Sequence, residues 1–135
     1  MVDLQHFVDA QERVMARVRE ELKAGKKSSH WMWFIFPQVA GLGHSETARR
    51  YAIASLEEAR AYAAHPVLGP RLRECVKLAL AVKDKSATAI FGTPDDLKFR
   101  SCATLFLRAT GDPLFRQALE KFYNGEEDHE TVKRI

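Results

Sequence analysis

A short loop with two glycines carries the clearest pattern for ligand chemistry in this sequence. Gly41 and Gly43 precede Ser45, a suitable N-cap for a helix that begins near Glu46. Glycines before a helix can turn several backbone N–H groups toward one point, and such a group of donors binds anions. The alternative is that both glycines only provide positive φ angles in a turn. No Gly-Lys-Ser/Thr sequence follows, so the loop is not of the Walker type.

Basic and amide side chains flank this loop. Arg49 and Arg50 follow Ser45 by about one helical turn, and the guanidinium of either could bind a phosphate or carboxylate through two parallel hydrogen bonds. Gln38 and His30 lie before the loop and are nearby polar candidates to bind the indole N–H groups. Together these side chains would suit a cleft for a phosphorylated ligand.

Both tryptophans of the chain, Trp31 and Trp33, belong to an unbroken apolar run over residues 31–36. The run has no polar face as a strand or as a helix, so either structure would be buried on most sides. Exposing several such side chains would cost roughly 1.5–3 kcal/mol each, and the run is far shorter than the about 20 residues that span a bilayer. We expect a buried central element that ends at Pro37. In a mixed arrangement, one indole would be buried and the other would line a cleft and stack on a nucleobase.

Two further groups have side chains that could act as acids or bases. His30 could be a general acid or base, or it could be a hydrogen-bonded residue that marks where the buried segment begins. Asp95 and Asp96 could form a catalytic pair or bind magnesium, although carboxylates in the first turn of a helix also stabilise it by about 0.3–1 kcal/mol each. Lys98 and Ser101 follow at helical spacing. They allow either a Ser–Lys nucleophile or an ion pair of Lys98 with Asp95.

Composition and the remaining motifs exclude several classes. The 135 residues carry a net charge of +3, and basic residues are interspersed with acidic ones, which argues against a nucleic-acid surface. The other histidines and the two cysteines show no metal-ligand spacing, so no metal site is expected. Cys75 and Cys102 are expected to be buried free thiols in a reducing compartment. The first residues do not resemble a secretory signal, and no membrane segment is present, so we expect a cytoplasmic protein.

Helical periodicity and capping residues predict one all-α domain over residues 1–135, with about six to seven helices around the buried segment 31–36. A first amphipathic helix is expected over residues 4–24, capped by Asp3 and ended by Gly25. The longer helices that follow are expected at residues 46–53, 55–64, 67–82, 94–109 and 113–123, with N-caps at Ser45, Ser55, Thr93 and Asp112. Shorter helical pieces are expected over residues 86–91 and 130–134.

Several motifs resemble those of the family of small bacterial helical proteins catalogued as domain of unknown function 1810. They cover most of the chain and include Ser29-His30-Trp31-Met32-Trp33-Phe34-Ile35-Phe36-Pro37-Gln38, Gly41-Leu42-Gly43, residues 65–72, residues 90–98, Thr104-Leu105-Phe106 and Phe122-Tyr123. The resemblance implies a mainly helical single domain and no established activity or cofactor. Members are sometimes labelled calpastatin, a protease inhibitor, but nothing in these residues supports that label. Cys102 stands where the family is expected to have another small residue, often serine.

Two functional hypotheses follow. In the first, a cleft near the 41–45 loop binds a nucleotide or another phosphorylated small molecule; in the second, the chain is a non-enzymatic protein–protein interaction module. A deep pocket with converging polar groups would favour the first, and a flat exposed apolar patch the second. Neither the reaction, if any, nor the oligomeric state follows from the sequence. The predicted ligand-binding residues are Trp31, Trp33, Gln38, Gly41, Gly43, Ser45, Arg49 and Arg50, and the candidate catalytic residues are His30, Asp95 and Lys98.

Overall fold

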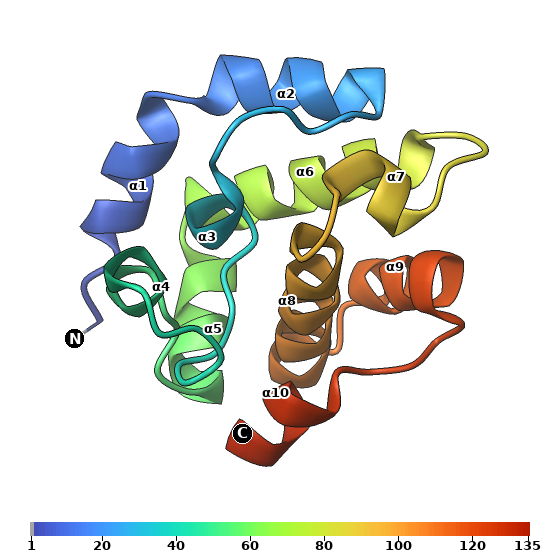
Figure 1. Ribbon diagram of the computed structural model, residues 1–135. Helices are drawn as coiled ribbons and strands as arrows, with labels where there is room; N and C mark the ends of the chain where they lie inside the picture. The colour runs from blue at the N-terminus through green and yellow to red at the C-terminus, as the bar shows by residue number, and fades with distance from the viewer. Residues whose placement is uncertain (1) are drawn as a thin grey trace.

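Ten helices make up most of residues 2–135, which are the residues that the computed structural model describes (Figure 1). The all-α prediction is confirmed, but the expected six to seven helices were too few. The helices are α1 (Gln5–Glu12), α2 (Met15–Ala24), α3 (Met32–Ile35), α4 (Glu46–Arg50), α5 (Leu56–Ala64), α6 (Leu68–Ala81), α7 (Ala87–Phe91), α8 (Asp95–Thr110), α9 (Pro113–Tyr123) and α10 (His129–Arg134).

The single helix predicted over residues 4–24 is divided into α1 and α2 at Arg13 and Val14. No glycine or proline marks the break in the sequence. Its cause is tertiary: α1 packs against α3, whereas α2 packs against α6, and one straight helix would not reach both. Gln11, just before the break, is buried, and its side-chain amide donates to the Phe34 carbonyl and to the Tyr62 hydroxyl.

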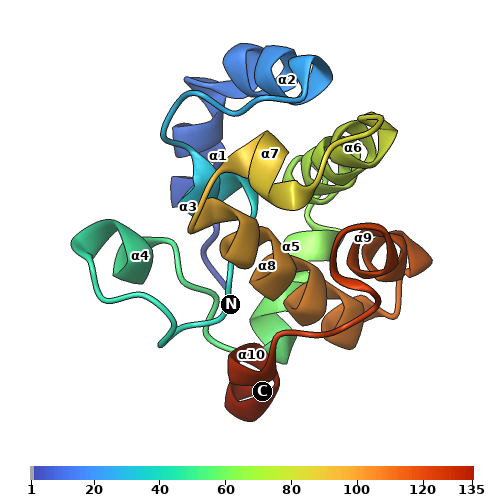
Figure 2. The same ribbon diagram turned by 45° about the vertical axis from the view of Figure 1, so that its right-hand side comes forward.

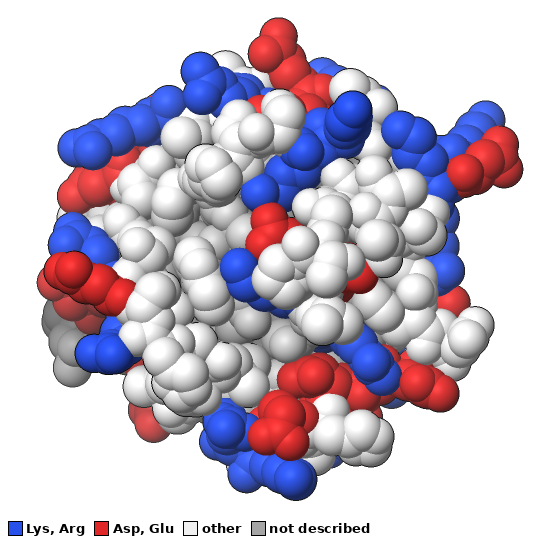
Figure 3. Space-filling model, viewed as in Figure 1, with Lys and Arg blue, Asp and Glu red and all other residues white. Residues whose placement is uncertain are grey.

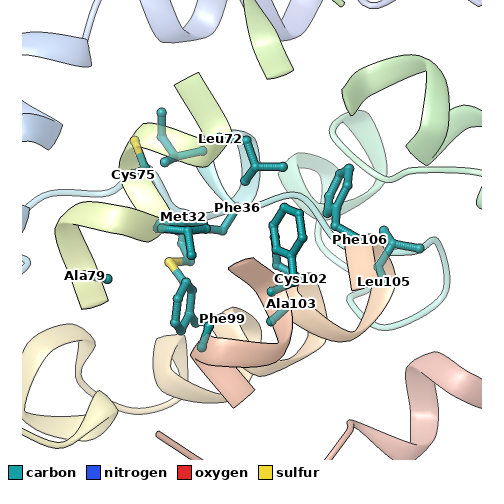
Figure 4. Close-up of a cluster of buried hydrophobic side chains, with 14 of the residues drawn as sticks. Met32, Phe36, Leu72, Cys75, Ala79, Phe99, Cys102, Ala103, Leu105 and Phe106 are labelled. Carbon is teal, nitrogen blue, oxygen red and sulfur yellow. The ribbon is translucent and has the colours of Figure 1, made fainter. Parts of the chain in front are cut away.

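Helix α8 is the centre of the packing. It contacts α5, α7, α9 and α10, and most of its residues from Phe99 to Ala109 are buried. Helix α6 packs against α2, α5 and α9. We call residues 31–36 the aromatic segment. Figure 4 shows Met32 and Phe36 of this segment between side chains of α6 and side chains of α8. The aromatic segment therefore joins the two longest helices.

The prediction that the whole 31–36 segment is buried was only partly correct. Trp31, Met32, Ile35 and Phe36 are buried, but Trp33 and Phe34 are half-buried. The segment forms a single helical turn, α3, and a helical turn directs its side chains around the whole axis. Part of its circumference therefore faces away from the core. That part carries Trp33.

Local capping signals predicted several helix ends correctly. Asp112 Oδ1 accepts a hydrogen bond from Leu114 N, and Ser55 Oγ accepts one from Glu58 N. Gly25 and Gly111 end α2 and α8 with left-handed φ angles of 70° each. Thr93 was the wrong N-cap for α8: the helix begins at Asp95, so the cap position falls on Pro94, which has no side-chain donor or acceptor.

The loop and short helix after the aromatic segment project to one side of the helical core (Figure 2). Ser45 caps α4 as expected, its Oγ accepting from Ala48 N at 3.1 Å, but the helix ends at Arg50 and not near Ile53. Ile53 instead pairs with the chain before the loop. Its N–H donates to the Gln38 carbonyl at 2.9 Å, and its carbonyl accepts from Ala40 N at 2.8 Å.

The two cysteines agree with the sequence-based expectation. Cys75 and Cys102 are free and buried, and burial raises the pKa of both thiols, to about 12 for Cys75. Neither thiol is therefore ionised at neutral pH. None of the helices within residues 2–135 has the length and apolar character required to cross a membrane.

Candidate ligand-binding site

A cavity of about 260 Å³ lies between the aromatic segment and the beginning of α8. We call it the lysine cavity. The side chains that matter for its chemistry are those of Lys27, His30, Trp31, Trp33, Asp95 and Lys98. In the space-filling view, basic and acidic side chains meet near the middle of this face, within largely uncharged surface (Figure 3).

Two lysines converge on one carboxylate in the lysine cavity. Lys27 Nζ lies 2.7 Å from Asp95 Oδ2, and Lys98 Nζ lies 3.0 Å from Asp95 Oδ1. Burial raises the pKa of the Asp95 carboxyl, but the hydrogen bonds from Lys27 and Lys98 outweigh it and hold that pKa below its usual value. Asp95 is thus ionised at neutral pH, and the three groups together carry one excess positive charge.

The two lysines have different surroundings. Lys27 has a side chain only 7% exposed, donates to the Ser29 carbonyl at 2.6 Å, and lies 5.1 Å from the centre of the Trp31 ring. Lys98 lies 4.3 Å from the centre of the Trp33 ring, a favourable cation–π distance. An ammonium group has three N–H donors, so the Asp95 contact leaves Lys98 with donors for a further acceptor.

A buried carboxylate fixes the wall of this cavity. Glu21 accepts hydrogen bonds from Trp31 Nε1 at 2.9 Å, from Ser28 N at 2.8 Å, and from the backbone and the hydroxyl of Ser29. Burial raises the pKa of Glu21, but these hydrogen bonds reverse the effect and lower it to about 2. Trp31 is 1% exposed and is held rigidly in the core.

Trp33 is positioned by Gly43. A Cβ atom on Gly43 would lie 2.6 Å from Trp33 Cη2 and 2.7 Å from the Ala48 Cβ, so any larger residue would displace the indole or α4. Gly43 does not have a positive φ angle, in contrast to Gly41, whose φ is 98°. The loop therefore needs Gly41 for its backbone conformation, and it needs Gly43 for the close approach of an aromatic ring.

A second cavity, of about 490 Å³, adjoins the first. We call it the glutamine cavity, after Gln38. Trp33, Ser45 and Lys98 line both cavities and so form their shared wall. The remaining lining comes from Gln38, from the 41–45 loop, from the beginning of α8 with Pro94 before it, and from α10 with Asp128 before it. It includes Gly43, Leu97, Ser101 and Glu130.

The amide nitrogen of Gln38 has no hydrogen-bond partner in the part of the chain that the structure describes. The residue is 4% exposed, and within residues 2–135 its Nε2 is the buried side-chain nitrogen or oxygen that lacks a partner. An unsatisfied buried donor costs about 1–3 kcal/mol. Most buried polar side chains are hydrogen-bonded, so this exception on a cavity wall requires an explanation.

The predicted ligand-binding residues divide into two groups. Trp31, Trp33, Gln38, Gly43 and Ser45 line one or both cavities. The remaining three belong to the scaffold of the loop. The Arg49 Nη2 donates to the His44 carbonyl at 2.6 Å, Arg50 lies over the Tyr51 ring at 5.7 Å, and a Cβ on Gly41 would meet Arg134 Nε at 2.9 Å.

The candidate catalytic residues are brought together in the lysine cavity. Asp95 and Lys98 form the ion pair that their spacing indicated, and the exposed His30 lines the same cavity. Ser101 Oγ lies 3.1 Å from the Leu97 carbonyl and 3.2 Å from Asp128 Oδ2. These contacts occupy the hydroxyl that a Ser–Lys nucleophile pair would require to be free.

Sequence reasoning missed Lys27, Asp128 and Glu130 as cavity residues. Lys27 belongs to the linker after α2, and its ion pair with Asp95 joins segments far apart in the chain. Asp128 caps α10 by accepting from Thr131 N at 3.0 Å, and Glu130 pairs with Arg134 at 2.9 Å. The ion pair of Lys27 with Asp95 is long-range and has no local sequence pattern. The contacts of Asp128 and Glu130 are local, but the place of these two residues at a cavity depends on how α10 packs against α8. Residues 2–135 bring together no group of three or more histidine, cysteine or acidic side chains that could hold a metal ion.

Comparisons with known proteins agree with the motifs. A family model described as "Protein of unknown function (DUF1810)" matches residues 1–135. The chain is similar to the crystal structure of the conserved hypothetical protein Rv1873 from Mycobacterium tuberculosis. The two sequences are 55% identical, the similarity covers 97% of this chain and 94% of that one, and the TM-score is 0.96. The comparison with curated proteins gives no match.

Proposed function

Since the chain belongs to the DUF1810 family, whose description assigns no function, we propose a function from its cleft: it binds a small molecule that carries a phosphate or another anionic group, such as a nucleotide. The anion would lie in the lysine cavity. The observation that carries the proposal is the convergence of Lys27 and Lys98 on the single carboxylate of Asp95.

Charge and donor count support an anionic ligand. Two ammonium groups and one carboxylate line the cavity, so the lining itself is net positive. Glu21 is not among the lining residues, and its carboxylate already accepts four hydrogen bonds. In a partly buried setting, electrostatic attraction is stronger than in water. Lys98 keeps N–H donors beyond its contact with Asp95, and the exposed ring of His30 lines the same cavity. The charge of Asp95 keeps the two lysines close together in the absence of ligand.

The size of the cleft supports a small molecule. Ligand pockets commonly have volumes of roughly 300–1,000 Å³. The lysine cavity of about 260 Å³ is slightly smaller than this range, and the adjoining glutamine cavity of about 490 Å³ extends it. The exposed large apolar side chains within residues 2–135 are limited to Val2 and Leu97, too few for the extended apolar patch of a protein-docking surface.

Isothermal titration with tripolyphosphate and with nucleoside triphosphates tests this function. We expect the parent protein to bind both types of compound. Lys98→Met keeps an apolar stem against Trp33 but removes the charge, and should weaken binding of both by about tenfold or more. Lys77→Met, an equal charge change on an exposed face of α6, is the matched control and should bind like the parent. Absence of binding by the folded parent at millimolar concentration would refute the proposal.

A further inference from the structure

We infer that the glutamine cavity is a subsite for a planar heterocyclic ring, and that the Gln38 amide recognises the hydrogen-bonding edge of that ring. This inference rests on the proposed function, because it assigns the uncharged part of the same ligand. The ring would belong to a nucleoside whose phosphates lie in the lysine cavity. Trp33 and Lys98 line both cavities, so one molecule can reach from one to the other past this wall.

The unpaired amide of Gln38 supports a ligand that carries a hydrogen-bond acceptor. Gln38 Nε2 is buried without a hydrogen-bond partner among residues 2–135, and Gln38 lines the cavity. A ligand acceptor placed there would satisfy a donor that folding leaves unpaired. A primary amide presents an N–H donor and a carbonyl acceptor side by side, and this pair matches the adjacent acceptor and donor of a purine edge.

The backbone of Gln38 is held in place by its neighbours. The backbone carbonyl of Gln38 accepts a hydrogen bond from Ile53 N at 2.9 Å, and the next residue, Val39, forms a parallel β-bridge with Ile53. Pro37 and Val39 on either side are buried. The backbone of residue 38 is therefore fixed from both directions, and it anchors the point from which the amide side chain extends.

The apolar side chains of the glutamine cavity support a flat ring as its occupant. Leu97 is 54% exposed although leucine side chains are usually buried, and it lines this cavity together with Pro94 and the half-buried Trp33. A flat ring between these groups would cover Leu97 and gain contact with the indole. A phosphate would gain neither of these contacts.

Charge sets the orientation of the ligand. Asp128 and Glu130 line the glutamine cavity, and their carboxylates already bind Thr131 and Arg134 respectively. They would repel a phosphate but not a neutral ring. The lysine cavity, with two lysines and one aspartate, has the opposite preference. The phosphates therefore lie toward Lys27, and the ring lies toward Gln38.

The experiment compares ring and phosphate separately. Isothermal titration is carried out with adenosine, guanosine, uridine, the three corresponding triphosphates and tripolyphosphate, on the parent, on Gln38→Leu and on Gln117→Leu. Gln117 is exposed on α9 and provides the same substitution away from both cavities. Gln38→Leu removes the amide and retains a side chain of similar size, and circular dichroism verifies that each variant is folded.

The inference predicts that the parent binds at least one nucleoside triphosphate about tenfold more tightly than tripolyphosphate. Gln38→Leu should lose this preference and keep the affinity for tripolyphosphate, and Gln117→Leu should behave as the parent. Equal affinity of the parent for tripolyphosphate and for every triphosphate would overturn the inference alone, as would an unchanged preference in Gln38→Leu. Binding of nucleosides without tripolyphosphate binding would support the ring subsite but overturn the proposed anion site. A parent that binds none of these compounds overturns both.

Discussion

The two buried glutamines of this protein have opposite hydrogen-bonding states. Gln11 is 1% exposed, and its amide nitrogen lies 2.8 Å from the Phe34 carbonyl and 3.0 Å from the Tyr62 hydroxyl. Gln38 is 4% exposed, and its amide nitrogen has no partner among residues 2–135. Both residues are polar and buried, yet among residues 2–135 only the amide nitrogen of Gln11 has hydrogen-bond partners.

The two indoles differ in the same way. Trp31 is buried, and its N–H donates to Glu21, whereas Trp33 is half-buried between two cavities. We call the surroundings of Gln11 and Trp31 the core side of the aromatic segment, and those of Gln38 and Trp33 the cleft side. On the core side the polar groups stabilise the fold. On the cleft side, a buried donor lacks a partner among residues 2–135 and an indole lines both cavities, and the proposed site rests on this difference.

The largest effect is expected on the core side, at Phe36. Its ring is 0% exposed and contacts Phe91 and Phe99 edge to face. Phe36→Ala should lower the free energy of unfolding by about 3–5 kcal/mol, as measured by urea denaturation. Phe34→Ala, at a half-buried position, should cost clearly less. Equal losses would mean that the two sides of the segment are equally packed.

Glu21 is expected to show the next largest effect. Glu21→Gln places an amide N–H₂ among the donors of Ser28, Ser29 and Trp31, so the free energy of unfolding should fall by about 1–3 kcal/mol at pH 7. A variant as stable as the parent would show that these hydrogen bonds do not hold the segment in place.

The pH dependence of the same residue provides a separate test. The folded-state pKa of Glu21 is about 2, below its ordinary value of 4.5, so its ionised form favours the folded protein. Its contribution is complete above about pH 4.5 and is lost as the pH falls through about 2. The difference in unfolding free energy between parent and Glu21→Gln should therefore shrink over this range. A constant difference would contradict the assignment.

The smallest effect on stability is expected for Gln38→Leu, in contrast to the matched substitution Gln11→Leu. Gln11→Leu removes a donor from the Tyr62 hydroxyl and the Phe34 carbonyl, and should cost about 1–3 kcal/mol in urea denaturation. Gln38→Leu removes an amide that is already unpaired, so its stability should equal or exceed that of the parent. A loss of similar size in both variants would show that Gln38 has a structural partner.

The sequence predicted the parts of the fold that depend on local signals. Asp112, Ser55 and Gly111 act at helix ends through hydrogen bonds to residues a few positions away. Their roles could therefore be predicted from the sequence. The break between α1 and α2 was not readable, because it results from packing against α3 and α6. Thr93 was misassigned because the helix starts after Pro94 and not at it.

The candidate site shows the same division. The composition of the aromatic segment and the glycine loop pointed to Trp33, Gln38 and Gly43, which line the cavities. Gly43 was expected to act as a turn residue. It is instead required for the close approach of Trp33, which a Cβ atom at position 43 would prevent. The pairing of Lys27 with Asp95 depends on how α8 and the linker after α2 are placed, and no sequence pattern contains that information.

The most direct test of ligand binding on the cleft side uses nuclear magnetic resonance. The protein has two tryptophans, so its spectra contain two indole N–H signals. Trp33→Phe assigns them, and the parent is then titrated with adenosine triphosphate. We predict that the Trp33 signal shifts in proportion to binding, because Trp33 lines both cavities, and that it shifts by more than the Trp31 signal, whose N–H is held by its hydrogen bond to Glu21. A Trp33 signal that stays in place while Trp31 shifts, or two signals unaffected at millimolar nucleotide, would contradict a ligand site on the cleft side.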